Sequence, residues 1–323
     1  MLLTAPSIPS LLIPSAARTL TGTLNFPMPD MAFVHSSGPR TSDERSLNNA
    51  GLFFTTIGAA ITAIKAAGYS QGYAGAYSQV HALPGHTETI TAADAWADLT
   101  AGTRVVGWGM GMQRPRVTWG AATTTVLLNV ANSSIHNMIL DWAGPVDGTT
   151  ALTVAAPITA SAAGCGIYDC YITAGVDADQ IVTIGLAITG NDFDLVNCRI
   201  YGATAAECTT LVNISTCDRT RIENCVIEGG TSSTTVGVVR MAATAPLNML
   251  IKNSMFTNRK ALSVHAVTGV AAMSGVFMDC GFGILDNATL GGIGTSNGIC
   301  QSIRCYTTNL AGENGALSTV VST

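Results

Sequence analysis

The sequence predicts an all-β protein that folds as a single-stranded parallel β-helix, a solenoid in which every coil adds strands to the coil before it. Two features support this prediction: a six-residue pattern that recurs at nearly constant spacing, and short apolar strands between its occurrences. The composition agrees with them, because 47% of the residues are apolar and only 11% are charged. Globular domains carry about 25% charged residues.

The recurring pattern reads apolar-x-Asn/Asp-Cys/small-x-apolar. Successive Asn or Asp positions lie 26 to 32 residues apart. Internal repeats of this length are typical of stacked architectures. The six occurrences are Ile135–Leu140, Ile167–Ile172, Leu195–Ile200, Ile222–Ile227, Ile251–Phe256 and Phe277–Phe282.

A second kind of apolar segment falls between these occurrences. Each period of about 27 residues therefore holds at least two short strands, separated by turns rich in Gly, Asn, Asp, Thr and Ser. One period then corresponds to one coil. The four clearest examples are Thr183–Ile188, Leu211–Ile214, Val236–Val239 and Ala261–Ala266.

The Cys and Asn residues of the pattern have a structural interpretation. Equivalent positions stack along the axis of a solenoid, and cysteine behaves as a small buried hydrophobe. We therefore expect an internal Cys ladder and an Asn ladder at a bend, where Asn tolerates unusual backbone angles. Metal binding and thiol crosslinks are the alternatives, but none of the nine cysteines forms a CxxC pair. The ladders comprise Cys170, Cys198, Cys225 and Cys280, and Asn137, Asn197, Asn224 and Asn253.

The rest of the chain divides around this repeat. Residues 1–50 are rich in Pro, Ser and Thr and predict an extended N-terminal arm. Residues 51–79 contain one capping helix and a linker, because Ile57, Ala60, Ile61 and Ile64 form an apolar face with helical spacing. Such a helix would cover the end of the stack. The β-helix itself is expected over 80–306, and a C-terminal tail over 307–323.

Several segments along the chain resemble a known family. Leu83–Ile90, Val105–Gly109 and Arg114-Pro115 precede the repeats, and Asn309–Glu313 follows them. This series, over roughly residues 50–315, resembles tailed-phage structural proteins with right-handed parallel β-helices, usually encoded beside the major capsid protein. The resemblance implies a head decoration (cement) protein on the outer capsid surface of the virion, assembled in the host cytoplasm. It further implies a homotrimer that binds the major capsid protein.

Charge and hydropathy narrow the range of partners. The net charge is −5, and Lys65, Lys252 and Lys260 are scattered, whereas a nucleic-acid groove needs clustered Lys and Arg. We expect no nucleic-acid partner and no membrane partner, because no run of 18 apolar residues occurs. The first residues lack a basic segment and contain three prolines, which favours an arm over a targeting peptide and weighs against a cell-surface adhesin.

A glycan-binding or glycan-cleaving tail spike is the alternative function. Glycoside hydrolysis needs two carboxylates about 5–9.5 Å apart, for which the candidates are Asp192 and Asp194 with Asp218, or Glu223 with Glu228. For a lyase, Asp177 and Asp179 are close to each other in the sequence, but no companion cluster of Lys, Arg or Asp accompanies them. Acidic residues in turns are usually solvated, so we expect no enzyme activity, no catalytic, metal or cofactor-binding residue, and no cofactor.

His86 is the most suggestive single residue, because it follows the Pro84-Gly85 turn beside Glu88. A histidine base needs a positioned acid or nucleophile next to it, so we expect a structural role in the turn. His81, His136 and His265 read as strand residues. The tryptophans of the first coils are expected to cap the core or fill a trimer interface rather than line a sugar groove; they are Trp96, Trp108, Trp119 and Trp142.

Overall fold

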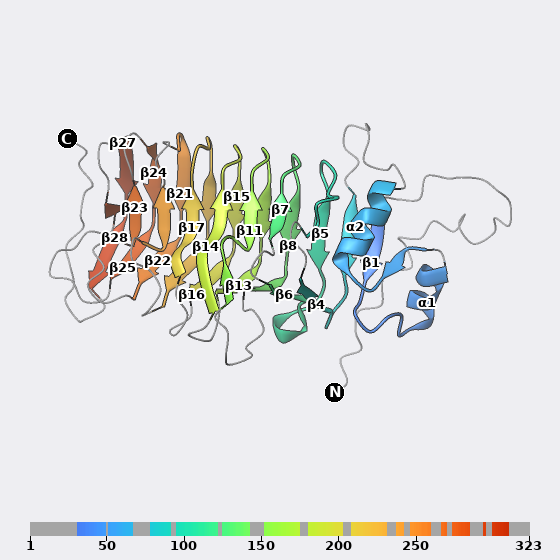
Figure 1. The fold of residues 1–323 in the computed structure, drawn as a ribbon. Coiled ribbons are helices and arrows are strands. Elements are labelled where there is room, and N and C mark those ends of the chain that lie inside the picture. Colours follow the sequence, from blue (N-terminus) through green and yellow to red (C-terminus); the bar gives the residue numbers. More distant parts are fainter. Residues whose placement is uncertain are drawn as a thin grey trace.

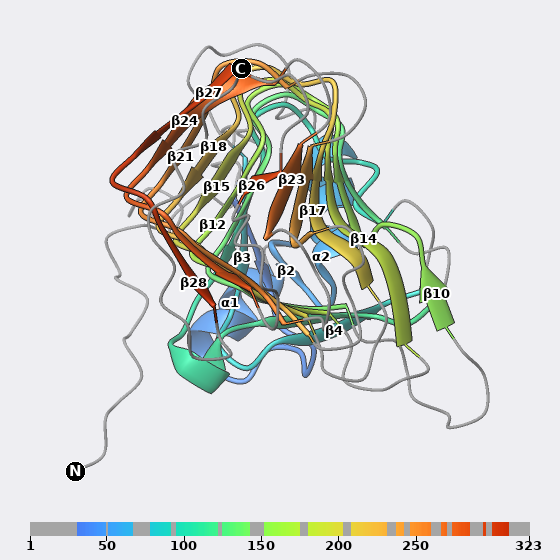
Figure 2. The same ribbon diagram turned by 90° about the vertical axis from the view of Figure 1, so that its left-hand side faces the viewer.

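The protein is a parallel β-helix, with strands stacked into three parallel sheets that run the length of the molecule (Figure 1). Viewed along the axis, the sheets enclose a three-sided core (Figure 2). The computed structural model describes residues 31–49, 51–66, 78–91, 95–121, 125–142, 152–174, 180–202, 208–230, 237–241, 246–259, 266–269, 273–284, 293–294 and 299–309.

Sheet A contains 11 strands and sheet B contains nine. In stacking order, sheet A consists of β2 (Phe53–Phe54), β1 (Met31–Val34), β3 (Gln79–Ala82), β5 (Arg104–Gly107), β8 (Ser134–His136), β12 (Gly166–Tyr168), β15 (Asp194–Val196), β18 (Arg221–Glu223), β21 (Met249–Lys252), β24 (Ser274–Met278) and β27 (Ile299–Ile303). Sheet B consists of β4 (Thr87–Ile90), β6 (Arg116–Trp119), β9 (Ile139–Asp141), β13 (Tyr171–Ala174), β16 (Arg199–Gly202), β19 (Val226–Gly229), β22 (Met255–Asn258), β25 (Gly281–Ile284) and β28 (Tyr306–Asn309).

Sheet C contains eight strands, seven of them in one path. From the N-terminal end, these seven are β7 (Val126–Leu128), β11 (Ile158–Ala160), β14 (Gln180–Ile188), β17 (Cys208–Ile214), β20 (Val239–Met241), β23 (Val267–Gly269) and β26 (Ile293–Gly294), and β10 (Leu152–Val154) pairs with β14 beside this path. The predicted segments Thr183–Ile188 and Leu211–Ile214 lie in β14 and β17. The segment Val236–Val239 overlaps only the start of β20, and most of Ala261–Ala266 lies outside the described residues.

Each six-residue repeat contributes to two strands rather than one. Its first half ends a strand of sheet A, and its second half begins a strand of sheet B. The Asn or Asp between them has φ between 49° and 56°, the left-handed region that these residues tolerate better than most. The predicted bend ladder is confirmed, and Arg304 extends it; its members are Asn137, Asp169, Asn197, Asn224, Asn253, Asp279 and Arg304.

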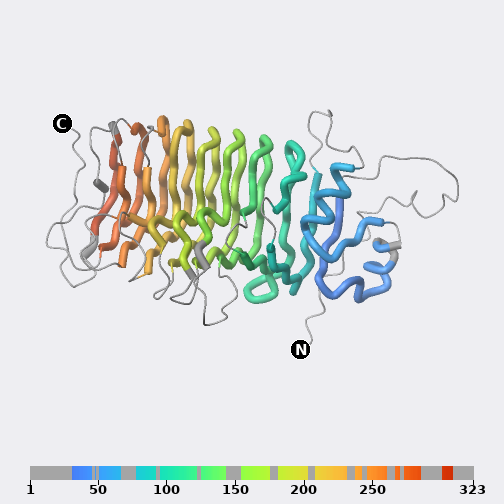
Figure 3. Tube along the Cα trace, viewed as in Figure 1, coloured from blue at the N-terminus to red at the C-terminus, as the bar shows by residue number. Residues whose placement is uncertain are grey.

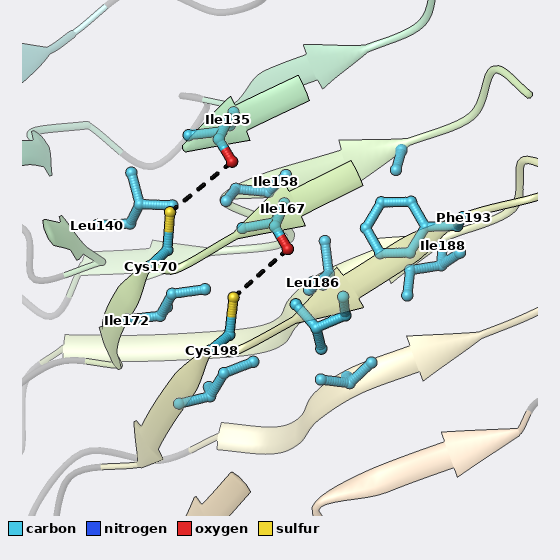
Figure 4. Packing of buried hydrophobic residues seen from close by; sticks show 14 of the residues in the cluster. Ile135, Leu140, Ile158, Ile167, Cys170, Ile172, Leu186, Ile188, Phe193 and Cys198 are labelled. Atoms are coloured by element: carbon cyan, nitrogen blue, oxygen red, sulfur yellow. Dashed lines mark hydrogen bonds between the residues drawn. The ribbon is translucent and has the colours of Figure 1, made fainter. Parts of the chain in front are cut away.

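The interior is one continuous apolar cluster that extends from Ala32 near the helices to Cys305 in the last coil. The predicted Cys ladder lies in this core, and all four of its thiols are buried. Each donates to carbonyls of its own and the preceding coil, for example Cys170 to Ile135 at 4.0 Å and Cys198 to Ile167 at 3.5 Å (Figure 4). Cys305 continues the ladder, and Ser254 occupies the rung between Cys225 and Cys280.

Helix α2 (Ile57–Ala66) covers the N-terminal end of the stack (Figure 1). Its predicted apolar face is buried in the core, as expected for a cap. The carboxylate of Glu88 in β4 accepts a hydrogen bond of 2.8 Å from the amide of Ile57. A carboxylate at this end of a helix satisfies an amide that has no partner within the helix, and it interacts favourably with the helix dipole.

Parts of the predicted boundaries differ from the structure. The sequence predicts an extended arm over residues 1–50, but residues 31–49 contain strand β1 and helix α1 (Ser42–Asn49). The solenoid therefore starts before residue 50, because β1 pairs with β3 through the buried Ala32 and Val34. The capping helix begins at Ile57, since Phe53 and Phe54 form β2. At the other end, β28 continues to Asn309 rather than ending at 306. Residues 1–30 lie outside the described part.

Candidate functional site

The outer face of sheet A carries a ladder of polar side chains across four successive coils. Arg221 donates two hydrogen bonds to the carboxylate of Asp194, at 2.8 and 2.7 Å. Tyr168 donates to the same carboxylate at 2.8 Å. Glu223 accepts from Arg221 at 3.4 Å and lies 2.9 Å from the ammonium of Lys252. These contacts join β12, β15, β18 and β21 through their outward side chains.

A second charged group lies where sheet C turns into sheet A. Arg219 binds Asp192 through two nitrogens, at 2.5 and 2.8 Å, and Asp218 through a third at 3.0 Å. The hydrogen bonds from Arg219 hold the pKa of Asp192 below its usual range. A general acid needs the opposite shift, toward a protonated carboxyl at neutral pH. Asp192 is thus an anion paired with a cation.

The candidate catalytic carboxylates therefore contact basic side chains. Glu228 follows the same rule, with its oxygen 2.7 Å from the guanidinium of Arg259. The Tyr168 phenol is also unsuited to act as a base, because burial and the neighbouring Asp194 raise its pKa to about 12. It is a hydrogen-bond donor rather than a phenolate base at neutral pH. Asp177, Asp179 and His265 lie outside the described residues.

His86 is fully buried in the turn that precedes β4, and its Nε2 lies 3.2 Å from Glu88 Oε2. The same carboxylate oxygen caps helix α2 through Ile57. The ring of His35 approaches His86 edge-on, with 6.4 Å between centroids. These contacts connect the Pro-Gly turn to helix α2 at the N-terminal end. His86 therefore has a structural environment, packed between the turn and the cap.

Three of the four tryptophans lie in the core. Trp96, Trp119 and Trp142 are buried, and Trp119 Nε1 donates to the Pro157 carbonyl at 2.9 Å. Trp108 is half-buried and donates to His81 Nδ1 at 2.9 Å. The sequence predicts that these rings cap the core or fill a trimer interface; the three buried rings lie in the core and present no aromatic platform to a sugar.

The feature that the sequence did not predict is the surface along one edge of the solenoid. Sheets A and B meet at a corner in each coil (Figure 2), and we call the line of these corners the A/B edge. It is marked by the bend ladder from Asn137 to Arg304. Between β5 and β6 the same corner is a longer loop that contains a 3-10 helix (Gly111–Gln113) and protrudes from the coils (Figure 3). Exposed apolar side chains gather at this edge.

Comparisons with known proteins give only distant structural similarities. No protein-family description and no curated protein matches the chain. Among solved structures, a rhamnogalacturonan lyase has a TM-score of 0.39 at 10% identity, over 81% of this chain and 75% of that one. ORF18 of Geobacillus virus E2 has a TM-score of 0.28 at 11% identity, over 78% of this chain and 58% of that one. The A-module of the Azotobacter vinelandii mannuronan C-5 epimerase AlgE6 has a TM-score of 0.21 at 13% identity, over 78% and 95%.

These similarities are too distant to carry an argument about activity. The strand order of the chain itself defines its class of protein, a parallel β-helix. None of the helices in the described residues is long and apolar enough to cross a membrane.

Proposed function

We propose that the protein is a structural component of a tailed-phage virion, a decoration protein that binds the major capsid protein as a trimer and stabilises the head. The observation that carries the proposal is the use of the polar side chains. The candidate carboxylates Asp192, Asp194 and Glu223 bridge one coil to another through Arg or Lys. These ion pairs stabilise the stacking of neighbouring coils. The sequence resemblance to phage head proteins supplies the virion context.

The mechanical properties of the fold suit this role. Successive coils are joined by backbone hydrogen bonds throughout the three sheets, and the side-chain contacts of the bend ladder and of sheet A add to them. A rod whose backbone groups are paired in this way resists bending and local unfolding. A capsid that contains packed DNA is under internal pressure, and a stiff protein bound across neighbouring subunits adds buried area where the shell is strained.

A binding experiment on phage heads tests the proposal. Heads that lack the protein are mixed with the purified chain, and bound copies are counted after sedimentation. We expect hundreds of copies per head and a higher temperature of DNA release. Binding of only a few copies at the tail tip, or none, would contradict the decoration role.

The glycan-directed alternative has its own measurement. Host surface polysaccharide is incubated with the protein, and newly formed reducing ends are quantified. We expect no release above background. Release that disappears in an Asp194→Asn variant would instead support a tail spike, because that substitution removes the charge while keeping the size of the side chain.

A further inference from the structure

We propose that Cys280 and Cys305 are an oxidisable pair of thiols, whose disulfide fixes the last coil of the solenoid to the coil before it. The two cysteines occupy equivalent places in successive coils, because β24 pairs with β27 and β25 pairs with β28 in register. Both belong to the apolar core. The chemistry of this pair does not depend on the function proposed above.

The two thiols have the same orientation. Cys280 donates to the carbonyl of Met278, two residues before it, at 3.2 Å, and Cys305 donates to the carbonyl of Ile303 at 3.5 Å. Each thiol also contacts a carbonyl of the preceding coil, at 3.5 and 3.4 Å. A further hydrogen bond joins the thiol of Cys280 to the sulfur of Cys305. The two sulfur atoms are therefore stacked one above the other and in contact.

The separation of the two coils suits a disulfide. Neighbouring strands lie about 4.8 Å apart, and the Cα atoms joined by a disulfide are usually about 4.4–6.8 Å apart. The Cβ atoms of a disulfide lie closer together, at about 3.8 Å, so the two coils must approach each other slightly. Asp279 and Arg304, one residue before each cysteine, keep the coils in register through hydrogen bonds of 2.6 and 2.7 Å.

The end of the stack permits this approach. Among the described strands, β27 and β28 are the last of sheets A and B, and each has a partner on one side only (Figure 1). Cys198 instead has paired coils on both sides, so drawing it toward Cys225 would stretch the pairing with the coil of Cys170. Ser254 occupies the rung between these inner thiols and Cys280, which separates the terminal pair from them.

Cys305 is the thiol of the pair that reacts first. The hydrogen bond from Cys280 lowers the pKa of Cys305 below its usual range, although burial opposes this shift. The contact with Cys305 and burial raise the pKa of Cys280. Because the thiolate is the nucleophilic form of cysteine, Cys305 provides the attacking sulfur. It is also the most exposed thiol of the ladder, at 8% against 0% for Cys280.

A peroxide supplies the oxidising equivalents. The Cys305 thiolate attacks one oxygen of hydrogen peroxide, the O–O bond breaks, and the departing hydroxide takes up the proton that Cys305 released. The Cys280 sulfur then attacks the resulting sulfenic acid at the Cys305 sulfur, and the Cys280 proton goes to the departing hydroxyl. The S–O bond breaks and the disulfide forms. The two thiols lose two electrons in total, and one peroxide is reduced to two waters.

The disulfide acts on the part of the solenoid that has the fewest backbone partners. Cys280 and Cys305 are 25 residues apart in the chain, and crosslinking a loop of this length reduces the entropy of the opened chain. The crosslink therefore opposes fraying of the last coil. In a virion component the thiols stay reduced in the host cytoplasm and close after release into an oxidising medium; this timing, unlike the chemistry, rests on the proposed function.

Peptide mapping tests the crosslink. The purified full-length chain is treated with a small excess of hydrogen peroxide, unfolded in N-ethylmaleimide and digested with trypsin from the monomeric band of a non-reducing gel. Cleavage after Lys260 and Arg304 places Cys280 and Cys300 in one peptide and Cys305 in the next. We expect the two peptides to be joined by a disulfide that a reductant breaks.

Serine variants identify the bond. Cys300→Ser is the matched control, because Cys300 is a buried thiol of the same coil that stacks on Gly275 instead of a cysteine. We expect the link to persist in Cys300→Ser and to be lost in Cys280→Ser and Cys305→Ser, with unchanged circular dichroism spectra. Serine suits the ladder, since Ser254 already occupies one rung. No linked peptide in the unaltered chain, or loss of the link in Cys300→Ser, would overturn the proposal.

Amide hydrogen exchange tests the effect on the last coil. Peptides that cover β27 and β28 are compared in the reduced and oxidised protein, with peptides that cover β12 as the internal reference. We expect oxidation to slow exchange in the last coil by up to about a hundredfold, a reductant to reverse this, and Cys305→Ser to show no change. Equal exchange in the two states of the unaltered protein would contradict the fixing of the last coil.

Discussion

At the scale of single residues, the Asn and Asp side chains of the repeat do two things at once. Their backbone takes the left-handed conformation that the sharp bend requires, and their side chains bond the neighbouring coil. Asn224 Nδ2 donates to Asn197 at 3.1 Å, and Asn197 Nδ2 donates to Asp169 at 3.1 Å. Both properties belong to the residue type, which explains why the ladder was predictable from the sequence.

His81 shows how burial changes a single group. Its imidazole stacks on Phe33 at 5.3 Å between centroids and accepts from Trp108 Nε1. Burial lowers the pKa of His81 to about 4. The unfolded chain binds a proton near pH 6.5, whereas the folded chain does so only near pH 4. Stability contributed by the neutral form is therefore complete above pH 6.5 and is lost as the pH falls toward 4.

We expect His81→Gln to flatten this pH dependence. Glutamine keeps an acceptor for Trp108 but does not titrate. Between pH 7.5 and 5, the melting temperature of the unaltered protein should fall more than that of the variant, with a difference in unfolding free energy of up to about 2 kcal/mol. Thermal unfolding at both pH values measures it. If the melting temperatures of the two proteins fall equally, His81 does not contribute to the pH dependence of stability in this range.

At the scale of elements, the corner between sheets A and B is the most regular unit. One residue turns the chain, and the next residue enters the core as a member of the Cys ladder. Burial raises the pKa of Cys198 well above its usual range, so that thiol packs as an apolar group. The sequence pattern predicted both ladders, but it suggested one strand per repeat where the structure has the ends of two.

The left-handed bend gives a prediction for Asn197. We expect Asn197→Gly to lose the side-chain bonds but keep the bend at little backbone cost, whereas Asn197→Val also forces a β-branched residue to φ near 55°. The left-handed region costs such a residue about 1–2 kcal/mol. Chemical denaturation should therefore rank the midpoints as unaltered protein, Gly variant, Val variant. If the Val variant is as stable as the Gly variant, the bend is not strained.

At the scale of the whole molecule, the solenoid has a closed N-terminal end. Helix α2 lies over the first coils and buries Ile57, Ala60, Ile61 and Ile64 (Figure 1). An uncovered end of a stack exposes apolar core and unpaired strands, which favours growth into larger assemblies. The cap was predictable because its apolar face has helical spacing within the helix itself.

We expect Ile61→Asp to open this end. A buried carboxylate without a partner costs several kcal/mol unless the helix detaches. Gel filtration should then show aggregates larger than the assembly of the unaltered chain. The control is Ala59→Asp, an exposed position in the first turn of the same helix, where an acidic residue is favourable. Unchanged elution of both variants would mean that α2 does not protect the end.

Five features could be predicted from the sequence: the coil, its length of about 27 residues, the Asn/Asp bend, the buried Cys ladder and the capping helix. Each of these depends on residues close together in the chain, whose backbone preferences and apolar spacing act locally. Strand β1 was missed because its four residues carry no repeat, and its place in sheet A comes from pairing with β3.

Which side chains meet between coils depends on how the coils are stacked, and it could not be predicted from local sequence patterns. A second ladder of residues with positive φ lies at bends of successive coils. Its members are Asn132, Asp192, Arg219 and Asn248. The same register pairs Asp194 with Arg221, and it lines up Tyr171, Ile303 and Tyr306 along one edge. These neighbours come from different coils, and a one-residue slip in the pairing of a strand with the next coil would exchange its inward and outward side chains. Local patterns therefore specify the coil, whereas the surface and its partners follow from how the coils are stacked.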